Sequence, residues 1–295
     1  MPGLLIEPDD VCLYVTEACN SNCIMCPMSN DTRKRGSSIQ EEKWATLAEQ
    51  IPEDAEHLTI TGGEPFLTYQ QLLPVIARIH ESHPFLPVLI LTNGRALSLN
   101  SLQEKLRPLI SPMDHYAIPI HAAEAGLHDS ITQSPGSYDQ AWKGIRFLST
   151  TDAQIEIRIV AHRHNLSHLS DIFASIVHSN CRISEINLIA MEMTGSAAKN
   201  RKDLWVDYAS VYQHASAGIR YAVEHEIDVG LYNFPLCTLP REAWSLSKNS
   251  ISAWKVRYNP DCENCSVLRA CGGLFYSVQE LKLCETKPFV EECEK

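Results

Sequence analysis

The sequence predicts an α/β fold, a partial (βα)6 barrel of the TIM type followed by a cysteine-rich C-terminal region. Three observations favour this fold. Six short β-branched or apolar runs recur along the chain, longer amphipathic segments lie between them, and the notable polar motifs stand where the runs end. In barrels of parallel strands, chemistry concentrates on the loops that leave the C-terminal strand ends.

The predicted strands have the length of ordinary strands. They lie at residues 11–15, 57–61, 88–92, 116–120, 155–160 and 185–190. Intervening segments predict helices because apolar residues recur in them at helical spacing; these segments are residues 38–51, 69–81, 139–149 and 169–179. The first segment opens with Ser38 and Glu41 at the spacing of a capping box, which predicts a helix start there.

The pattern changes near residue 200. A long helix is predicted at residues 207–226 and a strand at 228–232, and an irregular, cysteine-rich tail follows. We therefore expect a core barrel at residues 1–199 and a C-terminal auxiliary region at residues 200–295.

Composition and charge indicate a globular protein and disfavour two classes, nucleic-acid-binding proteins and membrane-spanning proteins. The chain has 295 residues, of which 44% are hydrophobic, enough to fill a sizeable core. A formal net charge of -11 disfavours extended binding to nucleic acid, which is itself anionic. The N-terminal residues lack a signal-peptide pattern, and no apolar run is long enough to span a bilayer, so we expect a cytoplasmic protein without membrane contact. The basic run at residues 33–35 is interpreted as a solvated surface.

Cysteine spacing is the main indication of chemistry. The segment "ACNSNCIMCP" places Cys19, Cys23 and Cys26 after the first strand, with three residues in one gap and two in the next. In a reducing compartment, thiols at such spacing are more typical of metal ligands than of disulfides. Three thiolates can hold three irons of a cubane [4Fe-4S] cluster and leave the fourth iron open. Structural zinc sites use four ligands, and ferredoxin runs have two residues in each gap, so the spacing favours neither.

This loop resembles the radical S-adenosylmethionine (SAM) superfamily, whose signature is C-x3-C-x2-C after the first strand. The resemblance implies that the open iron binds the amino and carboxylate groups of SAM. It also implies that an electron from the cluster cleaves SAM to methionine and a 5'-deoxyadenosyl radical, which abstracts a substrate hydrogen. Met25 departs from the aromatic residue that is common before the last cysteine in the family.

A second motif, "TITGGEP", follows the second strand and resembles the family's Gly-Gly-Glu-Pro motif for the SAM amino group. The cofactor-binding residues that it implies are Gly62, Gly63, Glu64 and Pro65. Glycine lets backbone approach a ligand closely, and a carboxylate can accept hydrogen bonds from an ammonium group.

Two further cofactor contacts are expected from weaker signals. Asn93 lies in "LTNG", which leaves the third strand and resembles a stretch near the cofactor in peptide-modifying relatives; an ordinary Asn-Gly turn is the alternative. Arg158 has an inward phase on the fifth strand and is a candidate to pair with the SAM carboxylate as a bidentate fork. A structural salt bridge is the alternative for Arg158.

A second cysteine group lies in the tail "CENCSVLRACGG", where two and then five residues separate Cys262, Cys265 and Cys271. The spacing resembles that of twitch and SPASM extensions of radical SAM enzymes, which carry an auxiliary [4Fe-4S] cluster. Zinc is the alternative, because four thiolates satisfy it equally well. Iron is favoured because an electron-transfer cluster suits radical chemistry. The fourth ligand is expected to be Cys237, with Cys284 as the alternative.

The segment that begins "YNFPLCTLPREAW" also resembles the C-terminal part of His-Xaa-Ser system radical SAM maturases, and the strand segment "INLIAMEMTG" fits the same family. This resemblance implies a maturase of a ribosomally synthesised peptide or small protein. Its implied partners are a substrate with His-Xaa-Ser repeats, an external electron donor and a partner radical SAM protein. The remaining cysteines, Cys12, Cys181 and Cys293, are expected to be structural.

Two other functions are kept as alternatives. One is a small-molecule twitch-type enzyme that resembles the molybdenum-cofactor GTP cyclase. The other is a nonenzymatic iron-sulfur electron carrier, which the Gly-Gly-Glu-Pro motif disfavours because a carrier needs no clamp for an amino acid.

Overall fold

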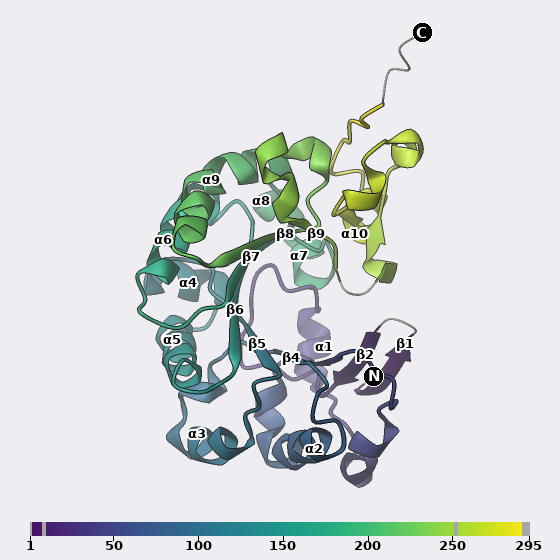
Figure 1. The fold of residues 1–295 in the computed structure, drawn as a ribbon. Helices are drawn as coiled ribbons and strands as arrows, with labels where there is room; N and C mark the ends of the chain where they lie inside the picture. Colours follow the sequence, from purple (N-terminus) through teal and green to yellow (C-terminus); the bar gives the residue numbers. More distant parts are fainter. Residues whose placement is uncertain (1, 8–9, 251–252, 291–295) are drawn as a thin grey trace.

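One curved sheet of nine strands organises the chain (Figure 1). The computed structural model describes residues 2–7, 10–250 and 253–290. The strands follow one another in chain order; β1 is antiparallel to β2, and each later strand is parallel to its neighbour. Their bounds are Gly3–Glu7 (β1), Asp10–Tyr14 (β2), Leu58–Thr61 (β3), Val88–Leu91 (β4), Asp114–Pro119 (β5), Gln154–Val160 (β6), Glu185–Ile189 (β7), Asp228–Tyr232 (β8) and Ser247–Lys248 (β9).

Most of the larger helices cover the outer side of the curved sheet, whereas α1 and α7 lie within the curve (Figure 1). Among the described residues, no helix has both the length and the apolar character needed to cross a bilayer. The helix bounds are Asn30–Arg35 (α1), Tyr69–Ser82 (α2), Asn100–Leu106 (α3), Ala125–Thr132 (α4), Ser137–Leu148 (α5), Leu169–Val177 (α6), Gly195–Lys199 (α7), Arg201–Leu204 (α8), Tyr208–Glu224 (α9) and Tyr276–Glu280 (α10).

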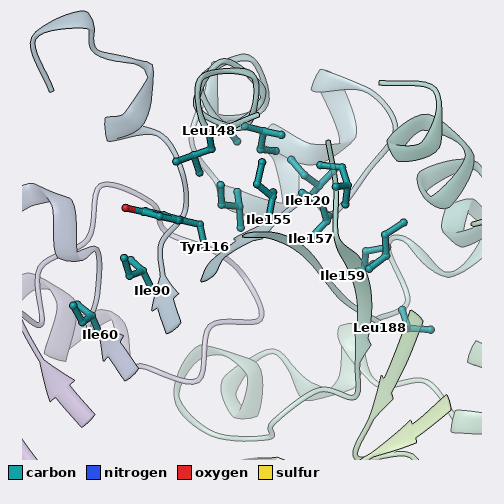
Figure 2. Packing of buried hydrophobic residues seen from close by; sticks show 14 of the residues in the cluster. Ile60, Ile90, Tyr116, Ile120, Leu148, Ile155, Ile157, Ile159 and Leu188 are labelled. Carbon is teal, nitrogen blue, oxygen red and sulfur yellow. The ribbon is translucent and has the colours of Figure 1, made fainter. Parts of the chain in front are cut away.

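Side-chain alternation along the strands separates a buried outer face from an inner face. Ile155, Ile157 and Ile159 on β6 are fully buried, and Ile155 lies near Leu148 of α5 (Figure 2). Because successive side chains of a strand point to opposite faces, the residues between these isoleucines face the inside of the curve. The inner face is therefore the wall on which polar strand residues can meet a ligand.

The fold class predicted from the sequence is confirmed. Each of the six predicted strands corresponds to one of β2 to β7, with ends that differ by at most two residues. The predicted helices at residues 69–81, 139–149 and 169–179 are α2, α5 and α6, and the long helix near residue 210 is α9. These elements were predictable because their hydrophobic periodicity is a local property of the chain.

The first predicted helix is wrong in its type and in its start. Two 3-10 helices, Glu41–Thr46 and Ala48–Gln50, stand in its place. Ser38 does not cap a helix: its Oγ lies 2.7 Å from Thr16 Oγ1, and the two residues form an antiparallel bridge. Pairing with the chain beyond β2 therefore overrides the local capping signal.

The sheet continues past residue 200 before the irregular region begins. β8 pairs with β7, and α9 packs against α6. Two short strands, Val256–Arg257 (β10) and Leu274–Phe275 (β11), form a separate antiparallel pair. A domain boundary between residues 199 and 200 stays a prediction, and Cys293 lies outside the described residues.

Candidate functional site

The cysteine loop, residues 19–26, leaves the C-terminal end of β2 and is fixed by the last turn of α4. The N–H of Asn22 donates to the carbonyl oxygen of Thr132 at 2.9 Å, and that of Ile24 donates to Ile131 at 3.0 Å. Carbonyl groups in the last turn of a helix have no partner within the helix and are free to accept these bonds. The end of α4 thus positions the loop before any ligand is bound.

The loop brings the Cys26 thiol close enough to Cys19 and Cys23 to affect the ionisation of both. Burial raises the pKa of Cys19 to about 11 and that of Cys23 to about 12, and the neighbouring Cys26 adds to both shifts. A buried thiolate needs a compensating cation, which a bound metal supplies. The N–H of Ser21 also donates to Cys19 Sγ at 3.4 Å. The donors therefore fit the three-cysteine cubane that the sequence predicts.

Arg33 on α1 braces the loop from inside the curve. Its guanidinium donates to Met28 O at 3.0 Å, to Asn22 Oδ1 at 2.9 Å and to Ser196 Oγ at 3.2 Å. The interpretation of the basic run as a solvated surface is therefore wrong for Arg33, which is 8% exposed, although its two basic neighbours are exposed. A run of three basic residues does not indicate in the sequence which of their side chains is buried.

The start of α7 holds the other end of the loop. The N–H groups of Ser196 and Ala197 donate to the carbonyl oxygen of Cys26 at 3.0 and 3.2 Å. Gly195 has a φ of +52°, and a Cβ there would overlap the carbonyl oxygen of Pro27. Glycine is therefore required at this position. Strands β2 and β7 are far apart in the sheet, so its curvature is what brings their ends to one site.

The Gly-Gly pair after β3 packs against the start of the cysteine loop. A Cβ on Gly62 would lie 2.5 Å from the carbonyl oxygen of Thr16, and one on Gly63 would overlap that of Ala18. The N–H groups of Gly63 and Glu64 donate to these two carbonyls at 2.6 and 2.8 Å. The close approach that we expected toward a ligand is made here toward the chain's own backbone, and it joins the two motifs.

Glu64 ties the end of β3 to the end of β4. Its carboxylate is fully buried: Oε1 accepts from the Phe66 N–H at 3.1 Å and the Thr92 hydroxyl at 2.7 Å, and Oε2 accepts from the Asn93 N–H at 2.7 Å. Burial raises the pKa of this carboxyl, and the three hydrogen bonds oppose the rise. A contact between Glu64 and the SAM ammonium stays a prediction. Pro65 begins the 3-10 helix Pro65–Thr68.

Asn93 reaches the cysteine loop directly. Its Nδ2 donates to Asn20 Oδ1 at 2.7 Å and lies 3.8 Å from Cys19 Sγ. Its Oδ1 accepts from the N–H of Arg95 at 3.0 Å, and the Arg95 guanidinium donates to Ser21 Oγ at 3.0 Å. Sequence reasoning missed Arg95, although its place two residues after Asn93 was an available signal.

Arg158 lies on the inner face of β6, as its phase predicts, but its guanidinium is already engaged. Nε and Nη2 donate to the two carboxylate oxygens of Glu156 at 2.5 and 3.2 Å. The alternative interpretation, a salt bridge, thus describes the contacts that are present. A role for Arg158 in binding the SAM carboxylate stays a prediction.

Four cysteines line one cavity in the C-terminal region: Cys237, Cys262, Cys265 and Cys271. Burial raises the pKa of Cys237 and Cys271, and the nearby Cys262 contributes to both shifts. Four converging thiols fit a metal centre with a complete protein ligand set, either a cubane or zinc.

Cys284 lies near this cavity but does not line it. Its side chain packs against the hydrophobic core, and burial, followed by the nearby Cys237 thiol, raises its pKa to about 12. By contrast, Cys237 Sγ accepts the N–H of Lys287 at 3.3 Å, and Cys271 Sγ accepts that of Leu236 at 3.4 Å. Such N–H contacts are typical of sulfur ligands in iron-sulfur sites. They support Cys237 as the fourth ligand, which remains a proposal.

Residues 286–289 cover the cavity, and sequence reasoning missed this role. Cys262 Sγ lies 3.4 Å from Thr286 Oγ1, and the N–H of Ser266 donates to Phe289 O at 2.8 Å. The Phe289 ring packs 5.0 Å from that of Trp244. The aromatic residue near the end of the chain was an available signal for this contact.

A partial parallel barrel with a three-cysteine loop at a strand end defines a class of iron-sulfur proteins. The sequence model of the Radical SAM superfamily matches residues 13–176, more than half of the chain. The chain therefore belongs to the radical SAM superfamily. Membership of this superfamily implies a [4Fe-4S] cluster and SAM as the cofactors.

Curated relatives match at low identity. An AdoMet-dependent heme synthase from Oleidesulfovibrio alaskensis is 25% identical over 204 residues, which cover 68% of this chain and 50% of the relative. A probable GTP 3',8-cyclase from Sulfurisphaera tokodaii is 24% identical over 188 residues, which cover 63% of this chain and 57% of the relative. The chain spans about half the length of the curated relatives that it matches.

Solved structures share the fold. Streptococcus suis SuiB bound to S-adenosylmethionine has a TM-score of 0.64 and 15% identity, over 96% of this chain and 76% of that chain. SuiB bound to the precursor peptide SuiA has a TM-score of 0.61 and 15% identity, over 78% of this chain and 50% of that chain. At these identities the likeness shows the fold alone.

Proposed function

We propose that the protein cleaves SAM reductively and uses the resulting radical to modify a ribosomally synthesised peptide or small protein. The observation that carries the proposal is the convergence of three strand ends on one loop. The loops after β2, β3 and β4 hold the three sequence motifs and are joined by hydrogen bonds through Glu64 and Asn93. The fold of SuiB, which was solved with a precursor peptide, supports a peptide as the substrate class.

In this proposal, Cys19, Cys23 and Cys26 hold the cubane, and the residues around SAM are Gly62, Gly63, Glu64, Pro65, Asn93 and Arg158. When bound, the cluster supplies the electron that cleaves SAM. The protein's own contribution is rigidity, because α4, α7 and Arg33 hold the cysteine loop by hydrogen bonds. The inner face of the barrel would hold the substrate and exclude water from the radical.

The proposal includes a second, auxiliary [4Fe-4S] cluster on Cys237, Cys262, Cys265 and Cys271, in a twitch- or SPASM-like region that begins near residue 200. The shared cavity of these four thiols supports it. The His-Xaa-Ser substrate context, an external electron donor and a partner radical SAM protein complete the proposal. They rest on the resemblance of residues 186–195 and 232–244 to His-Xaa-Ser system maturases.

A small-molecule substrate is the second candidate. Similarity to the probable GTP 3',8-cyclase favours it, since that relative matches over 63% of this chain. Product analysis separates the two candidates. A change in the mass of a His-Xaa-Ser peptide would support the first, and consumption of GTP without peptide modification would support the second.

The deciding experiment is anaerobic reconstitution with SAM and a strong reductant, followed by measurement of 5'-deoxyadenosine. We expect the wild-type protein to form it and Cys26→Ala to lose it, because two remaining thiolates hold a cubane poorly. Cys181→Ala is the matched control, since Cys181 lies at a helix-to-strand junction outside both cysteine sites. Undiminished 5'-deoxyadenosine in Cys26→Ala would contradict the proposed role of the loop.

A further inference from the structure

A group of potential metal ligands lies on the inner face of the barrel, away from both cysteine sites. His115 on β5, Glu156 on β6 and Glu185 on β7 each offer one ligand atom, and these atoms lie within 4.8 Å of one another. Glu156 and Glu185 are direct partners in the ladder between β6 and β7. Three adjacent strands thus bring the three side chains together.

The spacing within this group is that of ligands around an ion. His115 Nε2 is buried and has no hydrogen-bond partner, yet it lies 3.3 Å from Glu185 Oε1 and 3.5 Å from Glu156 Oε2. Hydrogen bonds of this kind measure about 2.7–3.2 Å and need alignment. Two ligands at about 2.1 Å from a tetrahedral zinc ion stand about 3.4 Å apart. The two separations from His115 Nε2 match the spacing of ligands around one metal ion better than the length of a hydrogen bond.

Neighbouring side chains orient Glu156 toward His115. Glu156 Oε1 accepts two hydrogen bonds, from Arg158 Nε at 2.5 Å and from Asn187 Nδ2 at 2.7 Å. Oε2, which lies on the His115 side, accepts one longer bond from Arg158 Nη2 at 3.2 Å and is the freer oxygen. Asn187 is 1% exposed, and its own Oδ1 has no hydrogen-bond partner. Hydrogen-bonded carboxylate ligands are usual in metal sites. Arg158 balances only one of the two carboxylates, which leaves a negative charge for a cation.

We propose that His115, Glu156 and Glu185 bind one divalent transition-metal ion, of which Zn²⁺ is the representative, on the inner wall of the barrel. Imidazole and carboxylate donors suit zinc and its neighbours. Three protein ligands leave a coordination position for water or substrate. Glu156 lies about 13 Å along β6 from the C-terminal strand end, so this site is separate from the cysteine loop. The proposal does not depend on radical chemistry.

The test uses the full-length protein with both cysteine sites first filled by anaerobic reconstitution with iron and sulfide. The protein is dialysed against Zn²⁺, and zinc and iron are measured in the same sample. We expect the wild-type protein to bind one more zinc per chain than Glu185→Gln, at unchanged iron. Glu185→Gln and His115→Ala should each lower zinc affinity at least ~10-fold. His178→Ala, at an exposed histidine, is the control and should leave it unchanged.

Thermal unfolding gives a second readout that does not depend on counting metal. Zinc should raise the melting temperature of the wild-type protein and not that of Glu185→Gln, because an ion that binds only the folded state stabilises it. Equal zinc content in wild type and variants would overturn the proposal. Zinc uptake matched by a loss of iron would also overturn it, since the zinc would then occupy the cysteine sites.

Discussion

At the scale of single residues, the absence of a Cβ at Gly63 joins two motifs that are far apart in sequence. A Cβ there would lie 2.5 Å from the carbonyl oxygen of Glu17 and would overlap that of Ala18. We expect Gly63→Ala to destabilise the protein by ~1–3 kcal/mol and to lower iron retention at the cysteine loop, because the backbone must move apart. Thermal unfolding and iron content measure both effects.

The control for Gly63→Ala is Gly126→Ala in α4, where a new Cβ would meet no atom within 4 Å. Alanine is favoured over glycine in helices, so this variant should be neutral or more stable. Equal stability and iron content in the two variants would show that the contact beside Gly63 can relax at no cost.

The Glu64 carboxylate accepts three hydrogen bonds, and a neutral amide cannot accept all of them. We expect Glu64→Gln to leave iron content near normal and to weaken SAM binding at least ~10-fold, because it removes a charged acceptor and loosens the Asn93 loop. Calorimetric titration of the reconstituted protein with SAM measures the change. Glu49→Gln, in an exposed ion pair with Arg78, is the control. An unchanged dissociation constant would count against a role for Glu64 at the SAM site.

At the scale of elements, the short helix α1 acts through a single inward residue. Arg33 donates to Met28, Asn22 and Ser196 and so ties α1 and α7 to the cysteine loop. We expect Arg33→Lys to release iron several-fold faster to a chelator, since lysine lacks the planar fork that reaches several acceptors at once. Cluster absorbance followed over time measures the rate.

Lys34→Gln is the matched control for α1, because Lys34 is the exposed neighbour of Arg33 in the same basic run. It should release iron at the wild-type rate. If Arg33→Lys releases iron as slowly as this control, the hydrogen bonds from α4 and α7 suffice to hold the cysteine loop.

At the scale of the whole molecule, two cysteine sites stand on different parts of the chain and share no ligand. We therefore expect ~8 irons per chain after reconstitution, as two cubanes require. Substituting Cys19, Cys23 and Cys26 together should leave ~4, because the second site keeps its own thiols. Iron and sulfide analysis with electron paramagnetic resonance measures both. Binding of zinc and no iron by the triple variant, with both metals available, would make the second site a structural zinc site.

The triple variant also tests the fourth ligand of the second site. Cys237 lines the cavity and Cys284 does not. Cys237→Ala in this background should therefore lose the cluster spectrum, whereas Cys284→Ala should keep it. The opposite result would show that the chain near Cys284 moves to bind the metal.

The sequence by itself determined the order of strands and helices, because hydrophobic periodicity reports on which residues face a core at each point along the chain. It also determined the three-cysteine loop and its superfamily, since the ligand spacing is contained within eight residues. The first helix was predicted wrongly because its capping signal competes with Thr16, a partner outside the local segment.

Only the tertiary structure decided which side chains meet. It turned Arg33 inward, directed Glu64 toward Asn93, paired Arg158 with Glu156, and separated Cys284 from the cavity of the other four cysteines. The physical reason is common to all four. Each outcome depends on which of several possible partners lies within hydrogen-bond or ligand distance of the side chain. The curvature of the sheet sets those distances, and the sequence does not state them.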